Sequence, residues 1–261
     1  MRQRFVQSFS TSGTEIEAID AERLGKPYVS FIYDGQYIDW NTLSPTPPTP
    51  PEPVYSATPL TLEIVQGGTI VFQGYSTWLQ DKVISVSRDN GKTWETLTPT
   101  ADGTSINVSS GEKLILKGYN TSYGMSNAFC KFEKSTAHFN IYGNIMSLVD
   151  YDNFMTLNTL SATYVFAAMF RYCKIHNIDV YLPASVLTEG CYYDLFTQYD
   201  VNTIEKIKIT CLATDITAED CTRDWLTGVS ATGTFVKHPD ATWTTGTSGI
   251  PTGWTVENAE I

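Results

Sequence analysis

The residues best suited to acid–base or metal chemistry are scattered along the chain. The three histidines, His138, His176 and His238, have no metal-type partners nearby in the sequence, so ordinary surface or core positions are expected for them. No G-x-S-x-G, Walker or H-E-x-x-H motif occurs. The sequence therefore predicts no catalytic residue set, no bound metal and no cofactor.

Two acidic pairs could in principle serve glycoside hydrolysis, which uses two carboxylates flanking a cleft. They are Glu219 with Asp220, and Asp150 with Asp152. Neither pair has a supporting pattern around it, so a solvated or helix-capping role is expected.

Aromatic side chains on exposed loops could stack on sugar rings. Candidates are Tyr75, Trp78, Tyr119, Tyr123 and Trp243. Trp78 in YSTWLQ and Trp243 in ATWTTG fall in expected loops, which makes these two the candidates for glycan contact. The alternative is that both fill the hydrophobic core.

The five cysteines are an odd number and show no zinc-type spacing. They are Cys130, Cys173, Cys191, Cys211 and Cys221. Buried free thiols are expected, and Cys211 with Cys221 is the one pair that could form a disulfide.

Composition narrows the class of protein. Apolar content of 42% and aromatic content of 13% indicate folded domains, and abundant Tyr, Thr and Val favour β structure. A net charge of −11 argues against nucleic-acid binding, and no apolar run approaches the ~20 residues that span a bilayer. The first residues carry basic side chains but no apolar core, so we expect no signal peptide and synthesis in a host cytoplasm.

A proline-rich stretch, PTPPTPPEP at residues 45–53, divides the chain. Proline fixes φ and lacks an N–H, so this run predicts a stiff polyproline II linker at residues 44–54. The expected organisation is an N-terminal arm at 1–43, the linker, a β module at 55–145 and a repeat module at 146–261.

The arm is small and aromatic. Residues 14–24 have a helical apolar pattern, and PYVSFIYDGQYIDW predicts a hairpin with strands at 28–33 and 37–40 around an Asp-Gly turn. A lone two-stranded hairpin has little stability in water. We therefore expect the arm to dock on another protein rather than on its own chain, through Tyr28, Phe31, Tyr33, Tyr37 and Trp40.

The β module shows short alternating segments separated by turn residues, which predicts a small β-sandwich of immunoglobulin-like type. Residues 87–94, SRDNGKTW, fit the pattern S-x-D-x-G-x-T-W and resemble the Asp-box hairpins of sialidase propellers. We expect Asp89 to cap the amides of the turn, Gly91 to take positive φ and Trp94 to pack across the strands. A single copy cannot form a propeller.

The next segment contains an internal repeat, which is found when the sequence is compared with itself at a shift of 26 residues. Met169-Phe170 aligns with Leu195-Phe196, and at the same shift residues 165–167 align with 191–193. One unit is expected to hold a short strand, a turn at Pro183, and a helical segment whose apolar residues are Leu187, Tyr192, Leu195 and Phe196. With one residue inserted, Ile207, Ile209 and Cys211 align with Val180, Leu182 and Ala184. A period in the twenties that combines strand and helix is typical of a leucine-rich-repeat solenoid.

The chain is expected to end in a cap. TDITAEDCTRDWLTG predicts a helix with Thr217 as N-cap, Glu219 and Asp220 in its first turn, and Gly228 past its end. Further strands are predicted at 234–236 and 254–256. The fold class is therefore mainly β with some α.

Residues 140–261 resemble the repeat and terminal cap of BspA-like leucine-rich-repeat proteins of Bacteroidetes. The segments that carry the resemblance are MFRYC, LPASVLTEGCYYDLF and the CLATDITAEDCTRDWLTG region with the residues after it. The same module is found in virion proteins of phages that infect those bacteria, including crAss-like phages. The arm, the linker and the small number of repeats look more like the phage proteins. The resemblance implies a structural virion component and no catalytic residues.

Three classes of function follow. The first is a virion surface protein, such as a head or tail fibre, that docks on capsid or tail proteins through its arm and assembles as a dimer or trimer. Such a fibre could contact a glycan or a protein on the host surface. The second is a bacterial surface adhesin, and the third is a carbohydrate-active enzyme.

Overall fold

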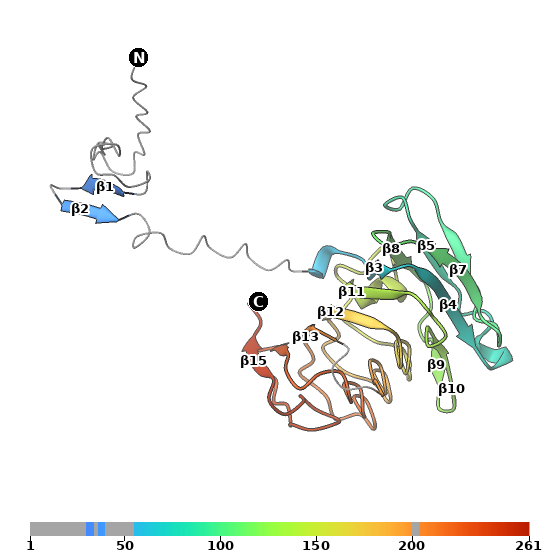
Figure 1. Cartoon of the computed structure of the whole chain (residues 1–261). Helices are drawn as coiled ribbons and strands as arrows, with labels where there is room; N and C mark the ends of the chain where they lie inside the picture. The colour runs from blue at the N-terminus through green and yellow to red at the C-terminus, as the bar shows by residue number, and fades with distance from the viewer. Residues whose placement is uncertain (1–29, 34–35, 40–54, 200–203, 261) are drawn as a thin grey trace, which may run out of the picture. The chain divides into compact units, whose positions relative to one another are not determined.

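The computed structural model describes residues 30–33, 36–39, 55–199 and 204–260. The chain separates into two compact units, Met1–Pro53 and Val54–Ile261. The described residues are mainly β, and the helices among them are three short 3-10 turns (Figure 1). These are η2 (Tyr55–Ala57), η3 (Thr77–Leu79) and η4 (Ile145–Leu148).

The first unit contains the expected hairpin. Strand β1 (Ser30–Tyr33) pairs with β2 (Gln36–Asp39) in antiparallel register, with Phe31 opposite Ile38. This confirms the hairpin predicted around the Asp-Gly turn. Phe31, Tyr33 and Tyr37 fall within these strands. The predicted helix at 14–24, the proline-rich linker, Tyr28 and Trp40 lie outside the described residues.

The strands predicted for the β module are present. They are β3 (Thr61–Gln66), β4 (Gly68–Gly74), β5 (Ile84–Ser87), β6 (Glu95–Leu97), β7 (Thr104–Val108), β8 (Lys113–Lys117), β10 (Ala128–Lys131) and β11 (His138–Asn144), with a short β9 (Gly124–Met125). Strands β7, β4, β10 and β9 form one sheet, and β6, β5, β8, β3 and β11 belong to a second. Apolar side chains from both sheets, such as Leu62 on β3 and Phe72 on β4, share one buried core.

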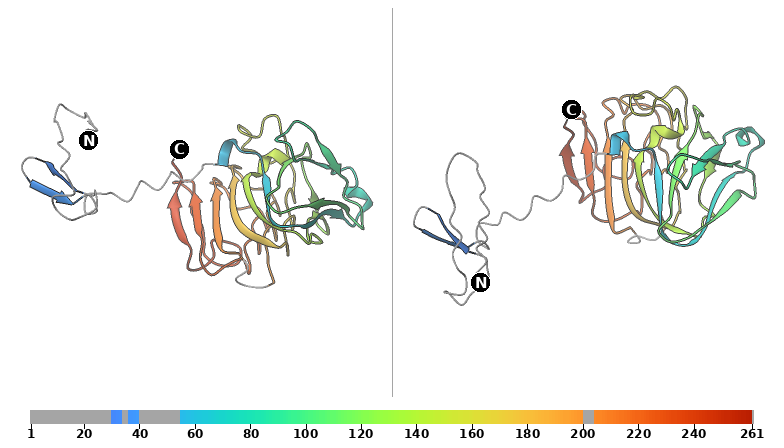
Figure 2. Two further views of the ribbon diagram at one scale, coloured as in Figure 1. Left: turned by 45° about the horizontal axis from the view of Figure 1, so that its top comes forward. Right: turned by 90° about the horizontal axis from the view of Figure 1, so that it is seen from above.

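The second sheet continues through the repeat module. Parallel strands β12 (Ile175–Leu182), β13 (Lys206–Cys211), β14 (Thr234–Lys237) and β15 (Thr255–Asn258) follow β11 in order and complete nine strands. Figure 2 shows these parallel strands side by side. The two predicted C-terminal strands are thus confirmed as β14 and β15.

The expected module boundary at residue 145 does not separate two cores. β11 pairs with β3 on one side and with β12 on the other, so the sheet is continuous across this point. Residues 54–261 form one unit, and its hydrophobic core cluster runs from Leu60 to Trp254. The alternating strand patterns of both segments look separate in sequence, but one sheet unites them.

The predicted alignment of β12 with β13 is wrong by two positions. Ile207 lies opposite Ile178 instead of Val180, and Ile209 lies opposite Val180 instead of Leu182. An even shift leaves the same apolar residues facing the core, which is why alternation alone did not fix the register.

The segments between the parallel strands are rows of turns, and the described residues contain no α-helix. We define row 1 as residues 164–173, row 2 as 190–198 and row 3 as 220–228. In row 1, every fourth residue has positive φ: Tyr164 at 52°, Ala168 at 55° and Tyr172 at 57°. A left-handed residue in every turn breaks the uniform φ and ψ of a helix.

Rows 2 and 3 correct the predicted helical segment and the predicted capping helix. Positive φ recurs at Asp194 in row 2 and at Asp220, Asp224 and Gly228 in row 3. The N–H of Thr217 donates to Asp215 Oδ1 at 3.0 Å, so Asp215, and not Thr217, caps the turn that leads into row 3.

The rows bind one another through backbone hydrogen bonds. Alternate N–H groups of row 1 donate within the row, while those between them donate to carbonyl oxygens of row 2, as from Phe166 to Cys191 at 2.9 Å and from Phe170 to Leu195 at 3.0 Å. Row 2 binds row 3 in the same way, as from Phe196 to Trp225 at 2.9 Å. This ladder satisfies the backbone groups of the turns without a helix.

Candidate functional site

Polar side chains form a continuous chain of contacts across the outer face of the nine-stranded sheet. Lys113 Nζ lies 3.2 Å from Glu63 Oε1, and Asn140 Nδ2 donates to Glu63 Oε2 at 3.3 Å. Asn177 Nδ2 donates to Asn140 Oδ1 at 3.0 Å, and the backbone N–H of Lys206 donates to Asn177 Oδ1 at 3.0 Å. The four side chains come from four strands, β8, β3, β11 and β12, and β13 joins them through the backbone of Lys206. We call this set the polar ladder.

A surface hollow of about 370 Å³ lies on this ladder. Glu63, Lys113, Asn140 and Asn177 line it, together with Tyr55, Tyr142 and Asp179. Strands β3, β8, β11 and β12 supply most of these residues, and Tyr55 comes from η2. Side chains with planar amide and carboxylate groups thus converge beside aromatic rings.

The two tyrosines of the hollow contact each other and the charged groups. The rings of Tyr55 and Tyr142 have centroids 4.9 Å apart at 37°, and Lys113 Nζ lies 5.8 Å from the centre of the Tyr142 ring. Partial burial, followed by the charge of Asp179, raises the pKa of Tyr55 above its ordinary value. The hydrogen bond to Glu63 raises the pKa of Lys113. Tyr55 is therefore a neutral phenol, and Lys113 is a cation, at neutral pH.

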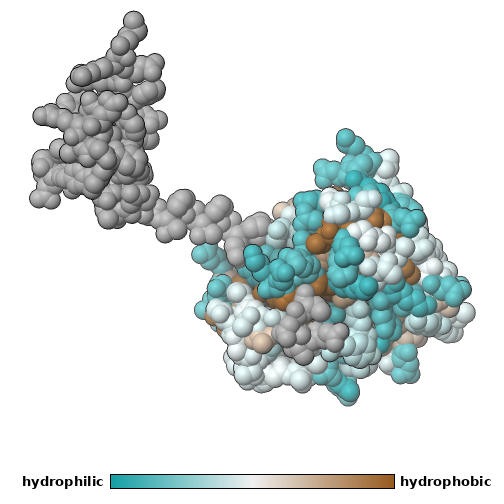
Figure 3. Space-filling view, viewed as in Figure 1, coloured by the Kyte–Doolittle hydropathy of each residue, from teal (hydrophilic) through white to brown (hydrophobic). Residues whose placement is uncertain are grey.

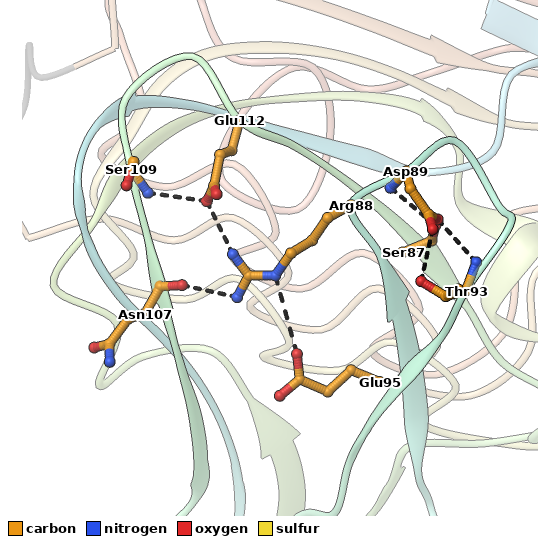
Figure 4. Close-up of polar contacts among 8 residues, drawn as sticks. All are labelled: Ser87, Arg88, Asp89, Thr93, Glu95, Asn107, Ser109 and Glu112. Atoms are coloured by element: carbon orange, nitrogen blue, oxygen red, sulfur yellow. Dashed lines mark hydrogen bonds and ion pairs between the residues drawn. The ribbon is translucent and has the colours of Figure 1, made fainter.

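The Asp-box turn has the geometry expected from its sequence (Figure 4). Asp89 Oδ1 accepts hydrogen bonds from the N–H groups of Lys92 at 3.1 Å and Thr93 at 2.8 Å, and Asp89 Oδ2 accepts one from Thr93 Oγ1 at 2.6 Å. Gly91 has φ of 84°, and Trp94 Nε1 donates to the Gly91 carbonyl oxygen at 3.1 Å. The Thr93 side chain leads the groups that lower the pKa of Asp89 to about 2.

Arg88 links this turn to the neighbouring hairpin. Its guanidinium lies 3.0 Å from Glu112 Oε2 and donates to the Asn107 carbonyl oxygen at 2.7 Å, while Glu95 lies 4.0 Å away (Figure 4). The charge and hydrogen-bond donors of Arg88 are thus matched by groups of the same chain, and we interpret these contacts as stabilising the two hairpins.

The aromatic candidates divide between surface and core. Trp78 is 76% exposed, and Tyr75 and Tyr119 are also exposed. Tyr123 was expected to be exposed but is fully buried, and its hydroxyl donates to the Leu148 carbonyl oxygen at 2.7 Å. Trp243 packs against the core, with its ring stacked on Trp225 at 5.5 Å. Only Trp78 of the two glycan candidates thus presents a free aromatic surface.

Two of the histidines lie beside carboxylates, and three of the paired acids make short-range contacts. His176 lies 3.3 Å from Glu205, and His238 lies 3.9 Å from Asp240. Asp150 Oδ1 accepts from the N–H of Asp152 at 3.2 Å, which caps a turn. The paired acid Asp220 bonds Arg223 within row 3.

All five cysteines are free and buried, so Cys211 and Cys221 form no bridge. Burial raises the pKa of each thiol above its ordinary value, to about 12 for Cys130 and Cys211, which makes them weak nucleophiles. Within the described ranges, no cluster of three or more His, Cys, Asp or Glu could hold a metal ion. No helix there is long and apolar enough to cross a membrane.

Sequence reasoning missed the hollow. Its residues alternate with buried apolar ones, as Asn177 and Asp179 do around Ile178, and this pattern identifies an outer sheet face without showing which positions meet across strands. The face of the described unit seen in Figure 3 is largely hydrophilic, with small hydrophobic patches. Comparison with models of known protein families, with curated proteins and with solved structures finds no match.

Proposed function

We propose that this chain is a structural component displayed on the surface of a phage particle. In this proposal the N-terminal arm docks on a capsid or tail protein, and the unit from Val54 onward projects as a fibre. The observation that carries the proposal is that the β1–β2 hairpin belongs to a compact unit of its own. The two strands form a two-stranded sheet, and residues 1–53 form a unit separate from the rest of the chain.

A hairpin of four-residue strands buries too little surface to be stable on its own. The sequence places five aromatic residues in and beside it, and a proline-rich run follows. A binding partner would supply the missing apolar contacts. The anchoring residues in this proposal are Tyr28, Phe31, Tyr33, Tyr37 and Trp40.

We also propose that residues 146–261 are a short leucine-rich-repeat-like solenoid with a terminal cap. The support is the succession of parallel strands from β12 to β15, each joined to the next by a turn-rich segment. Stacked units of this kind bury a continuous core, and each unit contacts its neighbours.

Deletion of residues 1–43 tests the docking proposal. Phage particles are isolated from cultures that produce either the full chain or the shortened chain, and the amount of each in purified particles is measured by quantitative mass spectrometry. The full chain is expected in the particles, and the shortened chain is expected to remain in the unassembled fraction. Circular dichroism of the purified shortened chain controls for loss of folding. Equal incorporation of both chains would overturn the proposal.

A further inference from the structure

We propose that the hollow on the polar ladder is a binding site for a neutral carbohydrate. The occupant is one or two sugar rings that carry hydroxyl groups and no ionised group. This inference rests on the proposed function only in placing the site on a displayed particle component. The binding argument itself depends on the hollow.

The size of the hollow fits a small ligand. Its volume of about 370 Å³ lies near the lower end of the range of about 300–1,000 Å³ that is typical of small-molecule sites. It is open to solvent on the outer face of the sheet, where a terminal or branching sugar of a larger glycan could enter. The floor is formed by paired strands, so the site is largely preformed.

The lining residues provide hydrogen bonds suited to hydroxyl groups. Asn140 and Asn177 each carry an amide with two donor hydrogens and an acceptor oxygen, and Glu63 supplies two acceptor oxygens. The polar ladder uses one contact from each of these amide nitrogens and fixes their orientation. Within the described segments each amide nitrogen makes this one contact, so its second donor hydrogen can meet a ligand. Sugar hydroxyls both donate and accept, so they match this mixture.

The aromatic pair supplies a surface for the apolar face of a sugar ring. Tyr55 and Tyr142 are both partly exposed and lie at an angle of 37° to each other. Aromatic rings of this kind offer a broad apolar area beside a polar hydroxyl group. Stacking on tyrosine and hydrogen bonding to fixed amides together favour a carbohydrate over a wholly apolar ligand.

The charges argue for a neutral ligand. Of the charged residues that line the hollow, Glu63 and Asp179 are acidic, and the basic residue, Lys113, is paired with Glu63 at 3.2 Å. A phosphate, sulfate or sugar acid would have to compete with Glu63 for the Lys113 cation. The net charge of the chain, −11, has the same effect at longer range.

Ligand-observed NMR with the purified full chain tests the inference. The probes are the methyl glycosides of glucose, galactose, mannose and N-acetylglucosamine, with glucuronic acid as the charged comparison. At least one neutral glycoside is expected to bind, and Tyr142→Ala and Asn177→Asp are each expected to weaken its binding tenfold or more. Met155→Ala, which truncates an exposed apolar side chain outside the hollow, is expected to leave binding unchanged. Trp78→Ala tests the competing glycan contact on the η3 loop. Urea unfolding of each variant confirms that its fold is intact.

Three results would overturn the inference. The first is the absence of binding by every neutral probe at 10 mM, a concentration on the order of that used for weak ligands. The second is binding lost in Trp78→Ala but kept in Tyr142→Ala, which would place the sugar on the η3 loop. The third is tighter binding of glucuronic acid than of the neutral glycosides. None of these results depends on particle assembly, so the docking proposal is tested separately.

Discussion

The rings of Phe170 and Phe196 stack 5.7 Å apart at 14°, although the whole of β12 lies between them in the sequence. Phe132, which follows β10, stacks on Phe170 at 5.3 Å and 3°. All three side chains are fully buried. The stack therefore joins the β module to rows 1 and 2, and it explains why residues 54–261 share one core.

Phe170→Ala is expected to destabilise the whole unit by about 3–5 kcal/mol, because it removes the central ring of this stack and leaves a cavity. Urea unfolding followed by circular dichroism and by NMR signals of β4 and β13 measures the effect. Both sets of signals are expected to disappear at one lowered midpoint. Separate midpoints for the two strands would show that the β module and the repeat module unfold independently. Trp78→Ala, at a surface position, serves as the control with little expected change.

Ala168→Gly and Ala167→Gly should differ in effect although each removes one buried methyl group. Ala168 has a φ of 55°, a conformation that is sterically unfavourable for alanine and favourable for glycine. Ala167 does not have a positive φ, so glycine brings no such relief there. Ala167→Gly is expected to lower the free energy of unfolding by about 1 kcal/mol more than Ala168→Gly does. Thermal unfolding of the two variants side by side gives the difference. Equal losses would contradict the turn geometry assigned to row 1.

Asp89→Asn is expected to weaken the Asp-box turn in a pH-dependent way. The pKa of Asp89 falls from its ordinary 3.8 to about 2 in the folded chain, so its carboxylate contributes stability above pH 4. That contribution is lost as the pH falls through about 2. The difference in urea midpoint between wild type and variant should therefore be constant from pH 7 to 5 and shrink below pH 4.

Asp102→Asn, at an exposed carboxylate that makes no hydrogen bond within the described segments, is the matched control for Asp89→Asn. Its midpoint should follow that of the wild type at every pH. A difference for Asp89→Asn that stays the same down to pH 2 would argue against the charged hydrogen bonds as its source.

Local patterns predicted the strands and the Asp-box turn well. The alternation around Ile84 and Val86, and the turn residues Asp89 and Gly91, correspond directly to β5 and to the turn that follows it. Ser87 is the exception to this alternation, because it is buried although the pattern places it on the exposed face. Its hydroxyl donates a hydrogen bond to Asp89 Oδ1 at 2.8 Å, which satisfies the buried polar group. Short-range hydrogen bonds and side-chain alternation are encoded within a few residues, so they can be read directly.

Features that depend on distant pairing were harder to predict. Apolar spacing at Leu187, Tyr192, Leu195 and Phe196 suggested a helix, but row 2 takes its hydrogen bonds from rows on either side, and Asp194 adopts positive φ. The hollow likewise requires Glu63, Asn140 and Asn177 to meet across three strands. The turns of row 2 and the hollow both depend on which residues lie opposite one another in neighbouring units. Apolar alternation does not determine this, because a shift of two residues keeps the same side chains on the same face.

Immunogold labelling of intact phage particles tests the central claim most directly. Antibodies raised against residues 55–199 are applied to purified particles and to the uninfected host cells, and the gold is located by electron microscopy. We expect label on the outer surface of the particles and none on uninfected cells. Particles that remain unlabelled, and that lack the chain after disruption, would contradict the proposal that this protein is a displayed particle component.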